Sequence, residues 1–206
     1  MAQSRPVYRQ ELTPLSFLER SASVHADRIA VEDGDLVYTY REWRRRAHRF
    51  ASALRRSGVA PGDRVAFLAL NSEPLLLAHF AVPMAGASLV AINTRLTAND
   101  IGWIVEHCGA RVLFHTPELA PLLEGLPEGV RRIDTGHELE ELLQTGSTND
   151  ELPALDSEDD VLAIDYTSGT TGRPKGVMYH HRGAYLNAIA MSEELHLRPG
   201  SRYLWT

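Results

Sequence analysis

The chain has 206 residues, 44% of them apolar, which fits one globular domain, or one and a part. Its net charge of −6 gives it no general electrostatic attraction for nucleic acid or for an anionic membrane. Cys108 is the only cysteine, so an intrachain disulfide is excluded and a reducing compartment is favoured. No apolar run is long enough to span a membrane, and residues 1–11 lack an apolar signal core. We therefore expect a soluble, cytoplasmic protein without integral membrane contact.

The first predicted elements are a β-hairpin and a helix. Residues 28–32 and 36–39 are β-like, and the Asp-Gly-Asp between them is typical of a hairpin turn. Thr39 and Glu42 have the spacing of a capping box, so a helix is expected to begin there and to end at Gly58.

Arginines crowd this predicted helix, and we interpret them as a solvated face, as charge runs at helical spacing usually are. They are Arg41, Arg44, Arg45, Arg46, Arg49, Arg55 and Arg56.

Strands and helices then alternate. Apolar strands are expected at residues 65–70, 88–92 and 111–115, and a buried helix at 73–85. A second helix, capped at Thr97, carries an apolar stripe of Ile101, Ile104, Val105 and Cys108, which places Cys108 in the core. A weaker helix, strand and helix follow up to Gln144. This alternation predicts an α/β fold, a mostly parallel sheet flanked by helices.

The last quarter of the chain differs in composition. Residues 145–160 are polar and acidic and are expected to form a surface loop, followed by strands at 161–167 and 176–179. A helix is expected at 182–195, with Tyr185, Ala188 and Ile189 on its inner side. The apolar, strand-like run at 201–204 has no closing cap, which favours a truncated chain or split gene product over an ordinary short C-terminal strand.

The loop between the two late strands carries the main functional signal. Lys175 is the only lysine, whereas the other 20 basic residues are arginines. A lysine is a compact, flexible point charge, and an arginine is a planar fork. Glycines let the backbone approach a ligand closely, and hydroxyls add donors. This composition suits a polyphosphate, and its residues are Thr167, Ser168, Gly169, Thr170, Thr171 and Gly172.

Two common nucleotide motifs fail in this loop. The phosphate loop of P-loop NTPases needs a lysine directly after its second glycine and then a serine or threonine, whereas Gly172 is followed by Arg173 and Lys175 by Gly176. No G-x-G-x-x-G lies between a strand and a helix. Glycines alone would leave a plain hairpin turn as an open alternative.

The complete string at 166–177 resembles the AMP-binding signature of the adenylate-forming superfamily, which comprises acyl-CoA synthetases, adenylation domains of peptide synthetases and luciferases. Further segments resemble the family in the same order, and the likeness covers roughly residues 12–206. These segments are 39–42, 61–66, 91–96 and His181-Arg182. The resemblance implies the N-terminal subdomain of the family's large domain. It divides the chain into a polar segment 1–11, an α/β subdomain 12–160, and 161–206 with the phosphate loop and following helix.

The resemblance also implies a reaction. Members activate a carboxylic acid with ATP, giving an acyl-adenylate and pyrophosphate, and a thiol, commonly of coenzyme A, then takes the acyl group. Carried over, residues 167–172 would line the β- and γ-phosphates, Lys175 would supply charge, and Thr167 would help to hold Mg²⁺. The family's later motifs and its mobile C-terminal domain, with a lysine needed for adenylation, are absent, so no catalytic residue is assigned here.

The expected parent is therefore an acyl-CoA synthetase, with a lean toward fatty or medium-chain acids, and the fragment alone is expected to be inactive. Two alternatives stay open: an adenylation domain serving a carrier protein, and a non-catalytic nucleotide-binding or interaction module.

His180 and His181 are expected to point to opposite faces rather than share a metal, with His181 structural and near the loop. Tyr166 is either a packing residue or a ligand. An unpaired sheet edge predicts a homodimer or larger species.

Overall fold

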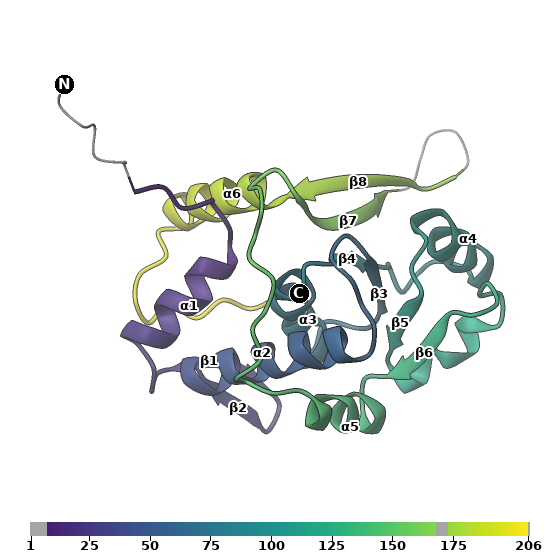
Figure 1. The fold of residues 1–206 in the computed structure, drawn as a ribbon, viewed down its shortest axis with the longest axis horizontal. Helices are drawn as coiled ribbons and strands as arrows, with labels where there is room; N and C mark the ends of the chain where they lie inside the picture. Colours follow the sequence, from purple (N-terminus) through teal and green to yellow (C-terminus); the bar gives the residue numbers. More distant parts are fainter. Residues whose placement is uncertain (1–7, 168–172, 206) are drawn as a thin grey trace.

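The computed structural model describes residues 8–167 and 173–205 (Figure 1). Its centre is a six-stranded sheet in the order β6-β5-β3-β4-β7-β8. The first five strands in that order are parallel to their neighbours, and β8 is antiparallel to β7. The strands are β3 (Arg64–Leu68), β4 (Ser88–Ala91), β5 (Val112–His115), β6 (Arg131–Asp134), β7 (Val161–Thr167) and β8 (Lys175–His180). The predicted α/β fold with a mostly parallel sheet is confirmed.

Helices cover both faces of the sheet because alternate strand residues point to opposite sides. Val65 and Phe67 of β3 belong to one buried cluster, which holds residues of three helices, α2 (Tyr40–Arg56), α3 (Glu73–Met84) and α5 (His137–Thr145). Ala66 and Leu68 of β3 belong to the opposite cluster, under α4 (Ala98–Cys108) and the 3₁₀ helix η1 (Pro117–Leu123). Cys108 is buried in this second cluster, as predicted. Within the described ranges, no helix has both the length and the apolar character that crossing a membrane requires.

The helix caps follow the sequence signals. The Thr39 side chain accepts from the Glu42 N–H, and the Glu42 carboxylate accepts from the Thr39 N–H, which completes the capping box of α2. The Thr97 side chain caps α4 by accepting from the Asp100 N–H, without a return bond to the Thr97 N–H, and α4 is followed by Gly109, whose φ of 69° suits glycine. The hairpin of β1 (Ile29–Asp33) and β2 (Leu36–Thr39) also forms as predicted.

The arginine run of α2 is only partly a solvated face. Most of its members are exposed, but Arg46 keeps only 17% of its side chain accessible. Its Nε lies 2.6 Å from Oε1 of Glu73, whose side chain is 2% exposed, and it also pairs with Glu140. The expectation is wrong for Arg46, because α3 and α5 pack beside α2 and enclose this position.

Three further features differ from the sequence prediction. Helix α1 (Leu15–Val24) was not predicted, although Thr13-Pro14 before an apolar pair is a start signal. Residues 201–204 form no strand, since this segment has no strand beside it and places the Trp205 ring against His79 of α3 at 5.8 Å.

The outer side of α6 (His181–Glu194) is the third difference. Tyr185 stacks on Phe17 of α1 at 4.7 Å, as an inner residue would. Ala188 and Ile189 were expected on the inner side too, but both are exposed, Ile189 by 47%. No described element covers this part of α6, so the apolar side chains there have no partner to pack against.

Candidate functional site

The β7–β8 hairpin brings the two ends of the predicted phosphate loop together. Thr167, the last residue of β7, pairs directly with Lys175, the first residue of β8. Side chains of a directly opposed pair lie on the same face of a hairpin and close to each other. Both residues are exposed, and Lys175 makes no ion pair with any described residue. The remaining predicted phosphate-binding residues, Ser168, Gly169, Thr170, Thr171 and Gly172, lie outside the described residues.

The hairpin opens at the edge of the sheet where open α/β folds bind ligands. In such folds the binding crevice lies outside the carboxyl ends of the parallel strands. A cavity of about 390 Å³ lies there, bordered by residues that end or follow β3, β4 and β7. Its polar lining comes from Asn71, Asn93, Thr94, Arg95 and Asp165. Asp165 and Tyr166, the two residues before Thr167, thus border a polar recess.

Asp165 is the acidic group of this recess. It lies two residues before Thr167 and therefore on the same face of β7. Partial burial raises the pKa of its carboxyl above the ordinary value, and the nearby His79 opposes part of that rise. Sequence reasoning missed Asp165, although a carboxylate at the carboxyl end of an expected parallel strand is the signal that could have found it.

The position of Gly176 in β8 leaves little room for a side chain. It pairs with Tyr166 across the hairpin, and a Cβ built on Gly176 would lie 3.2 Å from Cζ of Tyr166 and 3.1 Å from Cγ2 of Ile164. A side chain there would displace the tyrosine ring. Burial, with a smaller contribution from Cys108, raises the pKa of Tyr166 to about 12, so its hydroxyl keeps its proton at neutral pH. These contacts favour packing, rather than ligand binding, for Tyr166.

The two histidines where β8 ends and α6 begins are structural, and His181 does not lie near the loop. His180 caps α6 by accepting from the Gly183 N–H at 3.0 Å. His181 is buried, and its Nδ1 lies 2.8 Å from the hydroxyl of Thr13. Burial lowers the pKa of His181. Because β8 runs from Lys175 to His180, this pair stands at the opposite end of the hairpin, which corrects the predicted location.

Metal ligands are sparse in the part of the chain that the structure describes. It contains no group of three or more His, Cys, Asp or Glu side chains arranged to hold an ion. Among the described residues, Thr167 supplies one hydroxyl oxygen at the start of the loop. Mg²⁺ usually keeps several waters and is bound by one or two carboxylates together with substrate phosphates, so this hydroxyl would supply only one of its ligands.

A larger cavity of about 580 Å³ lies elsewhere. It is bordered by Gly62, Ser88 and Val161 at the amino ends of β3, β4 and β7, and by the loop at 152–156. Its lining is mainly apolar, and Thr167 and Lys175 do not reach it. We place the candidate site at the carboxyl edge, because the paired residues Thr167 and Lys175 lie at that edge.

Comparison with known proteins identifies the family to which the chain is similar. Residues 18–206 match the family described as "AMP-binding enzyme". The acetate/butyrate–CoA ligase AAE7, peroxisomal, of Arabidopsis thaliana is 35% identical and aligns with 98% of this chain and 40% of its own length. A fatty acyl CoA synthetase of Mycobacterium tuberculosis superposes with a TM-score of 0.74 at 31% identity, over 82% of this chain and 34% of that one.

The nonribosomal peptide synthetase FmoA3 is also similar, with a TM-score of 0.79 at 26% identity, over 95% of this chain and 20% of that one. The present chain thus spans well under half the length of the curated relatives it matches.

Proposed function

This chain belongs to the AMP-binding enzyme family, and on that premise we propose that it is the N-terminal part of an ATP-dependent acid–CoA ligase. The observation that most supports this proposal is the direct pairing of Thr167 with Lys175 at the carboxyl edge of the sheet. It holds a hydroxyl and an ammonium at the two ends of a loop rich in glycine and hydroxyl side chains.

The proposed chemistry has two steps. The carboxylate of the acid attacks the α-phosphorus of ATP and pyrophosphate leaves, which gives an acyl-adenylate. The thiol of coenzyme A then attacks the acyl carbon, its proton is lost, and AMP leaves. Negative charge grows on the departing pyrophosphate in the first step, so donors and cations fixed beforehand around the β- and γ-phosphates lower the barrier.

Each residue has a role in that proposal. Lys175 places its ammonium against the β- and γ-phosphates, and Ser168, Gly169, Thr170, Thr171 and Gly172 surround them with hydroxyl and backbone donors. Thr167 offers its hydroxyl to Mg²⁺, which supplies positive charge to the phosphates when it is bound. No residue of this chain is assigned the chemical step itself, and we expect the 206-residue chain to give no turnover alone.

Calorimetry of Mg·ATP binding tests the nucleotide site. The chain should bind Mg·ATP, and Lys175→Ala should weaken binding about tenfold or more, because a charge-assisted contact to phosphate is lost. Arg45→Ala, which removes one exposed cation from α2, is the control and should bind as the unaltered chain does. Equal affinity for Lys175→Ala and the control would refute the assignment.

The acid is proposed as a fatty or medium-chain carboxylate, on the likeness of residues 177–188 to bacterial synthetases of that kind. One relative is named for acetate and butyrate, so shorter carboxylic acids should be tested as well. ATP–pyrophosphate exchange with acids from acetate to dodecanoate, on a protein that includes the family's later motifs, would identify the acid. The 206-residue chain in the same assay should show no exchange.

A carrier-protein adenylation domain is the second candidate, supported by the likeness to FmoA3. The two functions differ in the acceptor thiol. Supplying free coenzyme A should release acyl-CoA from a ligase, whereas an adenylation domain transfers the acyl group only to a carrier protein. A non-catalytic module would bind Mg·ATP and form no adenylate with any acid.

We also propose a cytoplasmic location and self-association. The single cysteine suits a reducing compartment. The peroxisomal assignment in the name of the Arabidopsis relative is the alternative, and cell fractionation distinguishes the two. Self-association follows from the exposed edge strand β8.

A further inference from the structure

The end of the hairpin that holds Thr167 and Lys175 lies beyond the register pair that joins the hairpin to the rest of the sheet. The ladder between β4 and β7 consists of one register pair, Leu89 with Ala163, near the start of β7. All six residues of β8 are exposed. The functional end of the hairpin therefore extends past its neighbour strand toward α4, as Figure 1 shows. Something other than strand pairing has to fix its position.

Two residues of α4 contact the strand that enters the loop. Nδ1 of His107 and the hydroxyl of Tyr166 are joined by a hydrogen bond of 2.7 Å. Trp103, one turn earlier on α4, meets the Tyr166 ring edge-on at 6.1 Å between centroids. Trp103 and His107 also stack on each other at 4.6 Å, so they form one surface. Tyr166 directly precedes Thr167, so this surface holds the first end of the loop.

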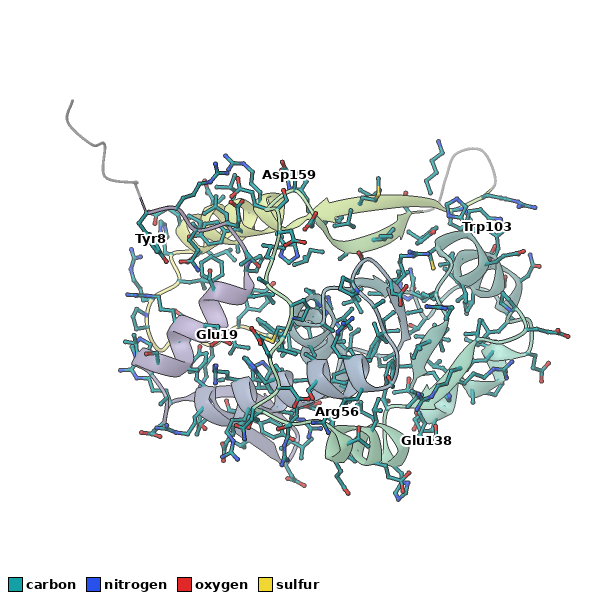
Figure 2. All side chains as sticks on the ribbon, in the orientation of Figure 1. Tyr8, Glu19, Arg56, Trp103, Glu138 and Asp159 are labelled. Atoms are coloured by element: carbon teal, nitrogen blue, oxygen red, sulfur yellow. The ribbon has the colours of Figure 1, made fainter. Side chains whose placement is uncertain are left out.

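The same surface contacts the segment that leaves the loop. The guanidinium of Arg173 lies 5.6 Å from the centre of the Trp103 ring, a cation–π contact. Arg173 stands two residues before Lys175. Figure 2 labels Trp103 beside this end of the hairpin. One indole thus contacts both segments that flank the loop, and Gly176, by lacking a Cβ, leaves Tyr166 the space to reach His107.

We propose that Trp103 and His107 are positioning residues that hold the hairpin, and with it Thr167 and Lys175, in the nucleotide-binding arrangement. In this role they act through Tyr166 and Arg173 rather than by contact with the substrate. The part of this inference that concerns nucleotide rests on the proposed function, whereas the part that concerns the hairpin does not.

Hydrogen exchange of the 206-residue chain without nucleotide tests the hairpin. Trp103→Ala and His107→Ala should each raise the exchange rate of backbone amides in β7 and β8 about tenfold, and leave β3 and β5 unchanged. Tyr166→Phe, which removes only the hydroxyl, should behave like His107→Ala. His107→Asn, which can place an amide near the position of Nδ1, should restore protection. Glu106→Ala is the control, since the Glu106 side chain is exposed on α4 and makes no hydrogen bond or ion pair with any described residue.

Calorimetry with Mg·ATP on the same variants tests the link to nucleotide. Affinity should fall about tenfold in Trp103→Ala and His107→Ala and recover in His107→Asn. Unchanged exchange in β7 and β8 overturns the role of α4, whether or not nucleotide binds. Faster exchange with unchanged affinity overturns the positioning of the nucleotide site. A third outcome separates the two proposals. If the variants exchange faster but the unaltered chain binds no Mg·ATP, the contact between α4 and the hairpin is supported and the proposed nucleotide site is refuted.

Discussion

At the scale of single residues, the environment of each cation decides its role. The 21 basic residues are nearly all arginine, and several are paired in the structure: Arg41 with Asp27, Arg44 with Glu19 and Arg56 with Asp150. Lys175 has no such partner among the described residues. A cation left without an intramolecular partner beside a polar recess remains available to an anionic ligand.

Arg46 leads to a stability prediction. Arg46→Met leaves the carboxylate of Glu73 buried and unpaired, so the free energy of unfolding should fall by about 3–5 kcal/mol. Urea denaturation followed by circular dichroism measures it. Arg45→Met, at the exposed neighbouring position, should change stability by less than about 0.5 kcal/mol.

A double variant shows whether the loss of stability in Arg46→Met comes from the unpaired buried charge of Glu73 or from lost packing. Arg46→Met combined with Glu73→Leu removes both charges, and most of the lost stability should return, because a well-packed apolar pair can replace a buried ion pair. A double variant as unstable as Arg46→Met alone would contradict the ion-pair explanation.

At the scale of elements, the acidic loop at 146–160 is attached to α2. Asp150 accepts from Nε of Arg56 at 2.7 Å and from the hydroxyl of Ser52 at 2.5 Å. Arg56 also donates to the carbonyl of Thr145 at 2.9 Å. The loop was correctly predicted as irregular and on the surface, and these contacts fix the route by which it reaches β7.

Asp150 gives the loop a pH dependence. Hydrogen bonds from Arg56 and then Ser52 hold the pKa of Asp150 at about 2, below its ordinary value of 3.8. A carboxyl with a depressed folded-state pKa stabilises the fold above its unfolded pKa and loses that effect as pH falls toward the folded value. The chain should therefore be more stable than Asp150→Asn at pH 7, and the difference should shrink between about pH 4 and pH 2.

Urea midpoints at several pH values measure this difference. Asp156→Asn is the control in the same loop, since the Asp156 side chain makes no hydrogen bond or ion pair with any described residue. If the difference in urea midpoint between Asp150→Asn and the unaltered chain stays constant from pH 7 to pH 2, the proposed link between the ionisation of Asp150 and stability is excluded.

At the scale of the whole molecule, β8 and α6 leave several apolar side chains exposed. On β8, Met178 is 67% exposed and Tyr179 47%, and on α6 Leu186 is 46% exposed and Ile189 47%. Strand β8 is also the edge of the sheet, so its outer backbone groups have no strand partner among the described residues. Exposed apolar edges favour pairing with another chain.

The 206-residue chain should accordingly form a dimer or larger species, and Met178→Lys should shift it toward monomer, because a charged edge residue opposes strand pairing. Light scattering over a range of concentrations measures this. Val24→Lys, on α1 at 57% exposure, is the control and should leave the mass unchanged. A monomer for the unaltered chain at every concentration would refute the prediction.

Local signals in the sequence were sufficient for most elements. The capping box at Thr39, the N-cap at Thr97, the apolar spacing of α2 and α4 and the short apolar strands depend on neighbours a few residues apart. The helix at 15–24 was missed, and the strand expected at 201–204 does not form, since apolar spacing alone cannot say whether a partner will be present.

The sequence by itself determined the α/β class, the family likeness and the residues suited to a polyphosphate, because residue type and short spacing carry that information. Only the tertiary structure decided that Asp165 borders a recess together with residues that follow β3 and β4, that His181 stands at the far end of the hairpin, and that α4 contacts both segments flanking the loop. Strand order sets such long-range contacts, and strand order depends on how separate elements pack rather than on the spacing within any one of them.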